Sequence, residues 1–222
     1  PIHCVPFMIG NDTKFVCNVK AVAFVPLFAK LAIEFQSFGK HERGGLLCED
    51  HQGLNVLKCL MNSSDSSFDD QHQQHADTTF LAVLIRLHQA GLFTKDDIQQ
   101  YELVHFVCIH AGVLFSVQRF RFLTECCPSA LLDIDDDVFG YVPLQWALKS
   151  DLTTFEIVLD TMVRYFPRWK GVTALFQKDR LCGESSFAHA CAKYSHSKVI
   201  EIVEQIIVRY SVTIPPQSFN IG

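Results

Sequence analysis

Apolar residues recur along the chain at the spacing of one helix face. After Phe155 they lie three, four, seven, eight and eleven residues on, at Val158, Leu159, Met162, Val163 and Phe166. Side chains at these offsets share one side of a helix, and Pro167 cannot continue it. The segment therefore predicts an amphipathic helix.

Other segments repeat this pattern. The same offsets recur from Phe24 and from Val199, and their first two turns recur from Phe80. A further copy, between Ser116 and Pro128, keeps half of the apolar offsets, and we interpret it as degenerate. The chain is thus predicted to repeat one helix several times.

A shorter helix is predicted before each of these stripes. Gly140 marks a turn, and Pro143 follows in the first helical turn, where its missing N–H costs nothing. The marker apolar residue of this helix is Leu144, and comparable strings have theirs at Ile2, Leu57, Val104 and Phe187. In the last three copies the marker precedes the second stripe by eleven or twelve residues, which predicts a tight turn. The first two copies contain an insertion of about ten residues.

The insertion of the second copy is visible in its composition. Residues 62–77 are rich in Ser, Asp, Gln and His and contain no Lys or Arg. We predict a flexible, solvated loop. Its His72-x-x-His75 pair, with the nearby aspartates, leaves a weak divalent-ion site as the alternative.

The copy around Leu144 resembles the ankyrin repeat, a β-turn followed by two antiparallel helices. The pattern Asp-x-x-Gly-x-Thr-Pro-Leu-His-x-Ala is matched at Asp137, Gly140, Pro143, Leu144 and Ala147, with departures at Val142 and Gln145. Longer blocks, at residues 42–50, 119–123, 127–132 and 164–171, are similar to an expanded group of uncharacterised ankyrin-like proteins found in diatoms. The resemblance covers nearly the whole chain and implies a protein-binding array without catalysis.

The expected fold is all-α, an ankyrin-type helical-hairpin solenoid with long, divergent repeats. One such unit cannot bury its apolar face alone, so stacked neighbours complete the core. We predict a single array over residues 1–222, with approximate units 1–48 (a truncated first repeat), 49–97, 98–134, 135–178 and 179–222. Because the first copy opens without its turn, we expect a fragment of a longer array. A HEAT or TPR solenoid is the alternative, and it would lack the turns that Gly140 and Gly183 mark.

The composition predicts a folded chain that binds neither membrane nor nucleic acid. With 49% apolar and 19% charged residues, intrinsic disorder is excluded. A net charge of -5 gives no attraction for phosphate backbones. No apolar stretch reaches the roughly 20 residues that span a bilayer. Nine cysteines, an odd number below the density of a disulfide scaffold, predict a reducing, intracellular compartment, the cytoplasm.

The sequence carries no catalytic signature. It has no G-x-S-x-G, P-loop, dinucleotide fingerprint or H-E-x-x-H motif, and no C-x2-4-C pair with zinc spacing. The vicinal Cys126 and Cys127 are expected to pack at a helix end. We therefore expect no enzyme activity, no cofactor and no metal. The function that we expect is a protein-interaction scaffold or adaptor, monomeric, with an unidentified protein partner.

The resemblance implies that turn tips and the exposed ends of the first helices contact the partner. In this sequence those positions are Val138, Phe139, Tyr141, Lys149, Ser150, Glu184, Lys193 and Tyr194. Aromatic residues are enriched at interface hot spots, although Phe139 and Tyr141 could instead pack on the adjacent tip.

A basic and aromatic run from Arg164 to Lys170 suggests an alternative function, a regulatory or nucleic-acid-binding accessory domain. Its aromatic rings could stack on bases and its cations could bind phosphates. The net negative charge favours a simpler interpretation, in which these cations complement the dipole at a helix end.

Overall fold

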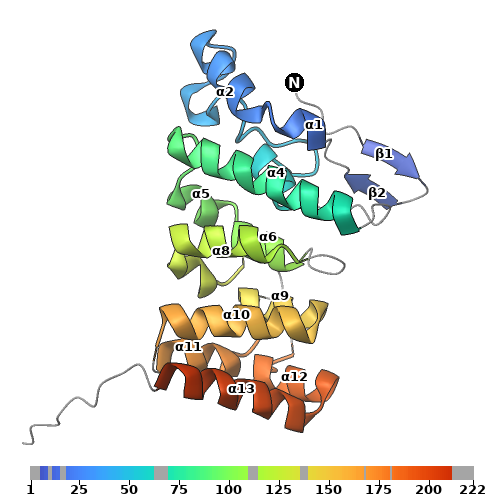
Figure 1. The fold of residues 1–222 in the computed structure, drawn as a ribbon, viewed down its shortest axis with the longest axis vertical. Helices are drawn as coiled ribbons and strands as arrows, with labels where there is room; N and C mark the ends of the chain where they lie inside the picture. Colours follow the sequence, from blue (N-terminus) through green and yellow to red (C-terminus); the bar gives the residue numbers. More distant parts are fainter. Residues whose placement is uncertain are drawn as a thin grey trace, which may run out of the picture. The chain divides into compact units, whose positions relative to one another are not determined.

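The structure of the chain, a computed structural model, describes residues 6–9, 12–15, 19–62, 70–109, 115–135, 140–167, 169–180 and 182–211 (Figure 1). Its elements are helices apart from one short strand pair, so the predicted helical class is confirmed. The chain divides into two compact units, Pro1–Ala130 and Leu131–Gly222, each of which is described by itself. The division lies close to the predicted repeat boundary between residues 134 and 135.

In unit 1, the long helix α4 (Asp70–Gln89) packs against α1 (Val19–Val22), α2 (Val25–Glu34), α3 (Val56–Met61) and α8 (Val117–Cys126). Helix α6 (Leu103–Ile109) contacts α3, α5 (Lys95–Gln100) and α8. Two short 3-10 helices are η1 (Lys40–Glu42) and η2 (Pro128–Leu131).

An antiparallel hairpin of β1 (Pro6–Ile9) and β2 (Asp12–Phe15) was not predicted by the helical pattern. It pairs Pro6 with Phe15 and Ile9 with Asp12. The predicted opening of the first copy, at Ile2, lies outside the described residues.

The core of unit 1 contains polar side chains at helix-face positions. The copy interpreted as degenerate keeps every one of its offsets buried, at Arg119, Phe120, Leu123, Thr124 and Cys127. The Arg119 guanidinium donates to Asp77 Oδ1 at 2.7 Å and to the Leu60 carbonyl at 2.5 Å. Thr124 Oγ1 donates to the Phe120 carbonyl at 3.0 Å. Polar residues are tolerated there because neighbouring groups accept hydrogen bonds from the Arg119 guanidinium and the Thr124 hydroxyl.

The prediction of a flexible loop over residues 62–77 is wrong for residues 70–77, which form the first turns of α4. Ala76 is buried, and Asp77 pairs with Arg119. Thr78 Oγ1 donates to the Gln74 carbonyl at 2.8 Å. Tertiary contacts here outweigh the polar composition that predicted a loop. Residues 63–69 lie outside the described residues.

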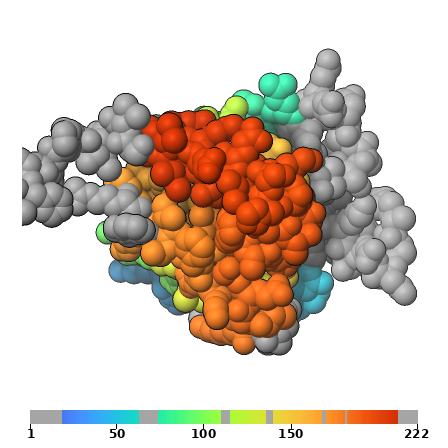
Figure 2. Space-filling view, turned by 90° about the horizontal axis from the view of Figure 1, so that it is seen from below, coloured from blue at the N-terminus to red at the C-terminus, as the bar shows by residue number. Residues whose placement is uncertain are grey.

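Unit 2 is built from two helix pairs. Helix α9 (Pro143–Ser150) is joined to α10 (Leu152–Tyr165) by Asp151 alone, and α12 (Ser186–Tyr194) is joined to α13 (His196–Ser211) by Ser195 alone. The members of each pair pack together, α10 lies beside α13, and α9 lies beside α12 (Figure 1). Between the pairs, the chain forms α11 (Trp169–Thr173) and η3 (Ala174–Phe176). Figure 2 shows the face of unit 2 that carries α13, in red.

Three turns of similar construction lead into α3, α9 and α12. In each, the backbone N–H of an aspartate donates to the carbonyl two residues before the helix, from Asp50 to Leu54, Asp135 to Tyr141 and Asp179 to Glu184. Each aspartate carboxylate also accepts a backbone N–H inside its turn. The glycines of these turns, Gly53, Gly140 and Gly183, have φ of 73°, 58° and 68°. This left-handed conformation favours glycine, which explains its recurrence before the first helix.

Candidate functional site

The structure brings together five of the predicted partner-binding residues of unit 2. Lys149, Ser150, Lys193 and Tyr194 lie at the C-terminal end of α9, and the Lys149 ammonium also contacts the ring of Tyr141, which precedes the helix. Glu184 lies apart, in the turn before α12. Val138 and Phe139 are outside the described residues.

Lys193 and Tyr194 complete the end of helix α9. The Lys193 ammonium donates to the carbonyls of Leu148, Lys149 and Ser150 at 3.0, 2.8 and 3.4 Å. Tyr194 Oη donates to the Leu148 carbonyl at 3.3 Å. The last carbonyls of a helix have no partner within it, and a cation is favourable at that end. These two side chains therefore hold one helix pair of unit 2 to the other.

Tyr141 packs inside the turn that precedes α9. Its side chain is 7% exposed, and its ring meets the Trp146 ring edge-on at a centroid distance of 5.1 Å. Trp146 Nε1 donates to Asp135 Oδ2 at 2.6 Å, and Lys149 Nζ lies 4.3 Å from the Tyr141 ring centroid. The expected turn aspartate, Asp137, lies outside the described residues, and Asp135 braces the turn. Tyr141 thus contacts its own turn and helix α9, whereas the alternative to partner binding was packing on the adjacent tip.

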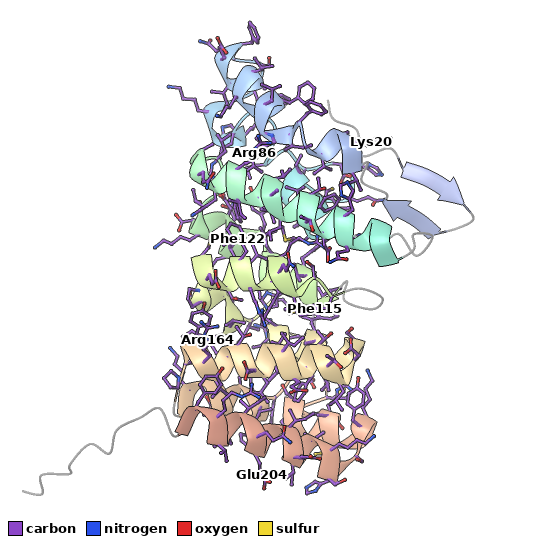
Figure 3. All side chains as sticks on the ribbon, in the orientation of Figure 1. Lys20, Arg86, Phe115, Phe122, Arg164 and Glu204 are labelled. Atoms are coloured by element: carbon purple, nitrogen blue, oxygen red, sulfur yellow. The ribbon has the colours of Figure 1, made fainter. Side chains whose placement is uncertain are left out.

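The basic and aromatic run lies at the end of α10. Arg164 is exposed there (Figure 3), and its guanidinium lies 5.7 Å from the Tyr165 ring centroid. Lys170 Nζ lies 5.4 Å from the Phe166 centroid. Arg168 and the Trp169 side chain are outside the described residues. The described cations contact rings of their own run, so nucleic-acid binding stays a prediction.

Unit 1 contains a groove that the sequence analysis did not predict. Its volume is about 1040 Å³, and one side is α2. We call it the α2 groove. Phe28 lies on α2 and Phe35 directly follows this helix. Both line the groove, and they are 51% and 73% exposed. The larger apolar side chains that line it are Val25, Phe28, Leu31, Phe35, Phe38, Leu46, Leu54 and Val56.

Gly44 and Gly45 allow the chain to close around this groove. Their φ angles are 69° and 87°. A Cβ on Gly44 would lie 2.2 Å from the Ala29 carbonyl oxygen, so only glycine permits this approach to α2. The preceding Arg43 pairs with the buried carboxylate of Asp97 and anchors the segment to α5. Both glycines line the groove.

The rim of the groove is acidic. Glu49 and Asp50 line it, and no Lys or Arg is among the described residues that do so. The Leu54 backbone N–H donates to Asp50 Oδ1 at 3.0 Å, and this bond holds the pKa of Asp50 below its ordinary value. On the groove wall, burial raises the pKa of the Cys48 thiol, which donates to Glu42 Oε1 at 3.3 Å. The rim therefore carries negative charge at neutral pH.

Asn55 places a buried donor at the groove. It is 1% exposed, and its Oδ1 accepts from the Lys58 N–H at 2.9 Å as the N-cap of α3. Asn55 is one of the residues that line the groove, and its buried Nδ2 has no hydrogen-bond partner among the described residues. Leaving a buried amide donor unpaired costs about 1–3 kcal/mol. The site can gain that energy from any acceptor that reaches it.

Groups of three or more His, Cys, Asp or Glu side chains that could hold a metal ion do not occur in the described ranges. The cysteines that the structure describes are free, and Cys108 is buried, which raises its pKa. Every helix in the described part of the chain is too short or too polar to cross a membrane.

Comparison of the chain with protein-family models, with curated proteins and with solved structures finds no match. Function is therefore inferred from the contacts and chemistry of the chain itself.

Proposed function

We propose that the chain is a protein-binding module, a scaffold or adaptor of ankyrin type that acts without catalysis. The observation that carries this proposal is the α2 groove of about 1040 Å³, which is lined by large, solvent-exposed apolar side chains. Exposed apolar patches of this kind on a folded protein mark interaction sites.

The turns support the ankyrin-type assignment. An ankyrin unit is a β-turn followed by two helices, and the turns at Gly140 and Gly183 each lead into a helix pair of unit 2. HEAT and TPR units have no such turn. The resemblance of the sequence to ankyrin repeats and the hydrogen bonds of these turns both favour protein binding, since ankyrin arrays bind proteins.

The test offers the immobilised full chain two probes, a display library of folded protein fragments and single-stranded poly-uridine RNA. We expect fragments to be retained at low and high salt, because apolar burial is not screened. Steeply salt-dependent retention of the RNA, lost in the Arg164→Gln/Lys170→Gln variant, would instead support the accessory nucleic-acid function.

A further inference from the structure

We propose that the α2 groove binds an extended apolar segment of a partner protein, with a Lys or Arg at one end of that segment. The inference rests on the proposed protein-binding function and assigns it a site and a ligand class. Its observations are the apolar walls, the unpaired amide of Asn55 and the acidic rim.

The apolar walls favour a peptide over a smaller ligand. Phe28, Leu31 and Phe35 line it from α2 and the residue that follows, and Leu46 and Leu54 line it from the later segment. The volume of about 1040 Å³ is at the upper end of the roughly 300–1,000 Å³ of small-molecule sites. Several side chains of one segment can enter together, and each removes apolar surface from water.

Asn55 favours an extended segment over a helix. Because its Oδ1 is committed to the α3 cap, the group that remains for a ligand is the Nδ2 donor. Carbonyls in the middle of a helix are already paired within it. An extended segment presents free carbonyls along its length, and main-chain hydrogen bonds give such segments affinity.

The rim determines the charge of the segment. Glu49 and Asp50 line the groove together with His51, and no Lys or Arg is among the described lining residues. A Lys or Arg beside the apolar residues of the segment is complementary to this rim, whereas a carboxylate there is repelled.

The experiment selects binders from a phage-displayed library of random linear peptides on the full chain. Enriched peptides are synthesised and titrated by fluorescence anisotropy. We expect apolar sequences with a Lys or Arg. We expect affinity to fall about tenfold in Asn55→Ser, which keeps a cap acceptor for α3 but replaces the amide Nδ2 with a shorter hydroxyl.

Two exposed positions keep the test independent of folding. Phe28→Asp is expected to abolish binding, and Glu49→Lys to weaken the Lys-containing peptides more than versions with Gln in its place. The matched control is Val208→Asp on α13, a similarly exposed apolar position in unit 2, which should bind normally.

Several outcomes would overturn the inference. Enriched peptides that bind the Phe28→Asp and Asn55→Ser variants as well as the original chain overturn the site but leave the protein-binding function standing. The same holds if no linear peptide is enriched while folded fragments are still retained. Acidic peptides overturn the ligand class. Self-association of the chain that is lost in Phe28→Asp would show that a second copy occupies the groove, and it would overturn the proposal. If the chain retains neither linear peptides nor folded fragments, the protein-binding function is contradicted as well.

Discussion

Helices α2 and α10 carry the same apolar pattern with opposite burial. In α10 the stripe from Phe155 to Val163 is buried against the rest of unit 2, and Phe155 is 0% exposed. In α2 the matching side chains are exposed, and the helix instead buries Val25, Pro26 and Ala29.

The difference teaches that periodicity determines which side chains share a face but not whether that face is covered. Helix α10 is covered by α9, α11 and α13. Helix α2 turns its smaller residues toward α4 and the Gly44 backbone, and its large residues flank the groove. The same pattern is core in one unit and candidate binding surface in the other.

The largest expected effect separates these two helices directly. Phe155→Ala should lower the free energy of unfolding by about 3–5 kcal/mol, because it leaves a cavity in the core. Phe28→Ala should change it by no more than about 0.5 kcal/mol, since the ring is half exposed. Urea unfolding measures both, by far-UV circular dichroism and, for unit 2, by the fluorescence of Trp146 and Trp169. Equal losses in the two variants would break the comparison.

A smaller effect is expected where the α2 groove is closed by glycine. Gly44→Ala should destabilise unit 1 by about 2–4 kcal/mol, because it combines a left-handed φ with a clash against backbone. Gly183→Ala has a similar φ but open space around its Cβ, so about 1–2 kcal/mol is expected. Thermal unfolding of the two variants ranks the two destabilisations. If Gly44→Ala is the less destabilising variant, the backbone at Gly44 can move away from Ala29.

Within unit 2, the predicted partner residue Lys193 should matter for stability. Lys193→Met removes the ammonium from three carbonyls of α9 and is expected to cost about 1–2 kcal/mol. Lys198→Met, at an exposed position on α13, is the matched control and should cost little. If both variants have the same free energy of unfolding, the contacts of Lys193 with α9 contribute nothing to stability. Lys193 would then remain a candidate partner-binding residue.

The smallest effect concerns the turn beside the groove. The pKa of Asp50 is depressed in the folded chain, so its stabilising contribution is present above the unfolded value and is lost as pH falls through the folded one. Asp50→Ala should therefore lower stability by a few tenths of a kcal/mol at neutral pH and not at all well below about pH 4. A difference that persists in acid would assign the effect to something other than the carboxylate.

Much of the fold could be predicted from the sequence because helix faces and turn glycines leave local signals. The stripe from Phe155 and the glycines at 140 and 183 indicated α10 and the turns of unit 2. Helix α8 was undervalued because Arg119 and Thr124 occupy core positions, and only their partners in space explain why. The first turns of α4 were missed for the same reason.

The candidate site was harder to predict. No local pattern shows that Gly44 lies against Ala29, or that Asn55 is buried with its Nδ2 unpaired. The sequence signals available for the groove were the clustered phenylalanines from Phe24 to Phe38 and the pair Gly44-Gly45. Neither signal alone indicates a groove. In unit 2, the residues predicted for a partner are largely used by the fold.

Hydrogen exchange of the full chain, with and without a selected peptide, tests the central claim most directly. We expect the peptide to slow exchange in α2 and in residues 44–59 and to leave exchange in α10 unchanged. Protection confined to unit 2, or none in α2, would contradict the assignment of the exposed apolar face as a binding surface.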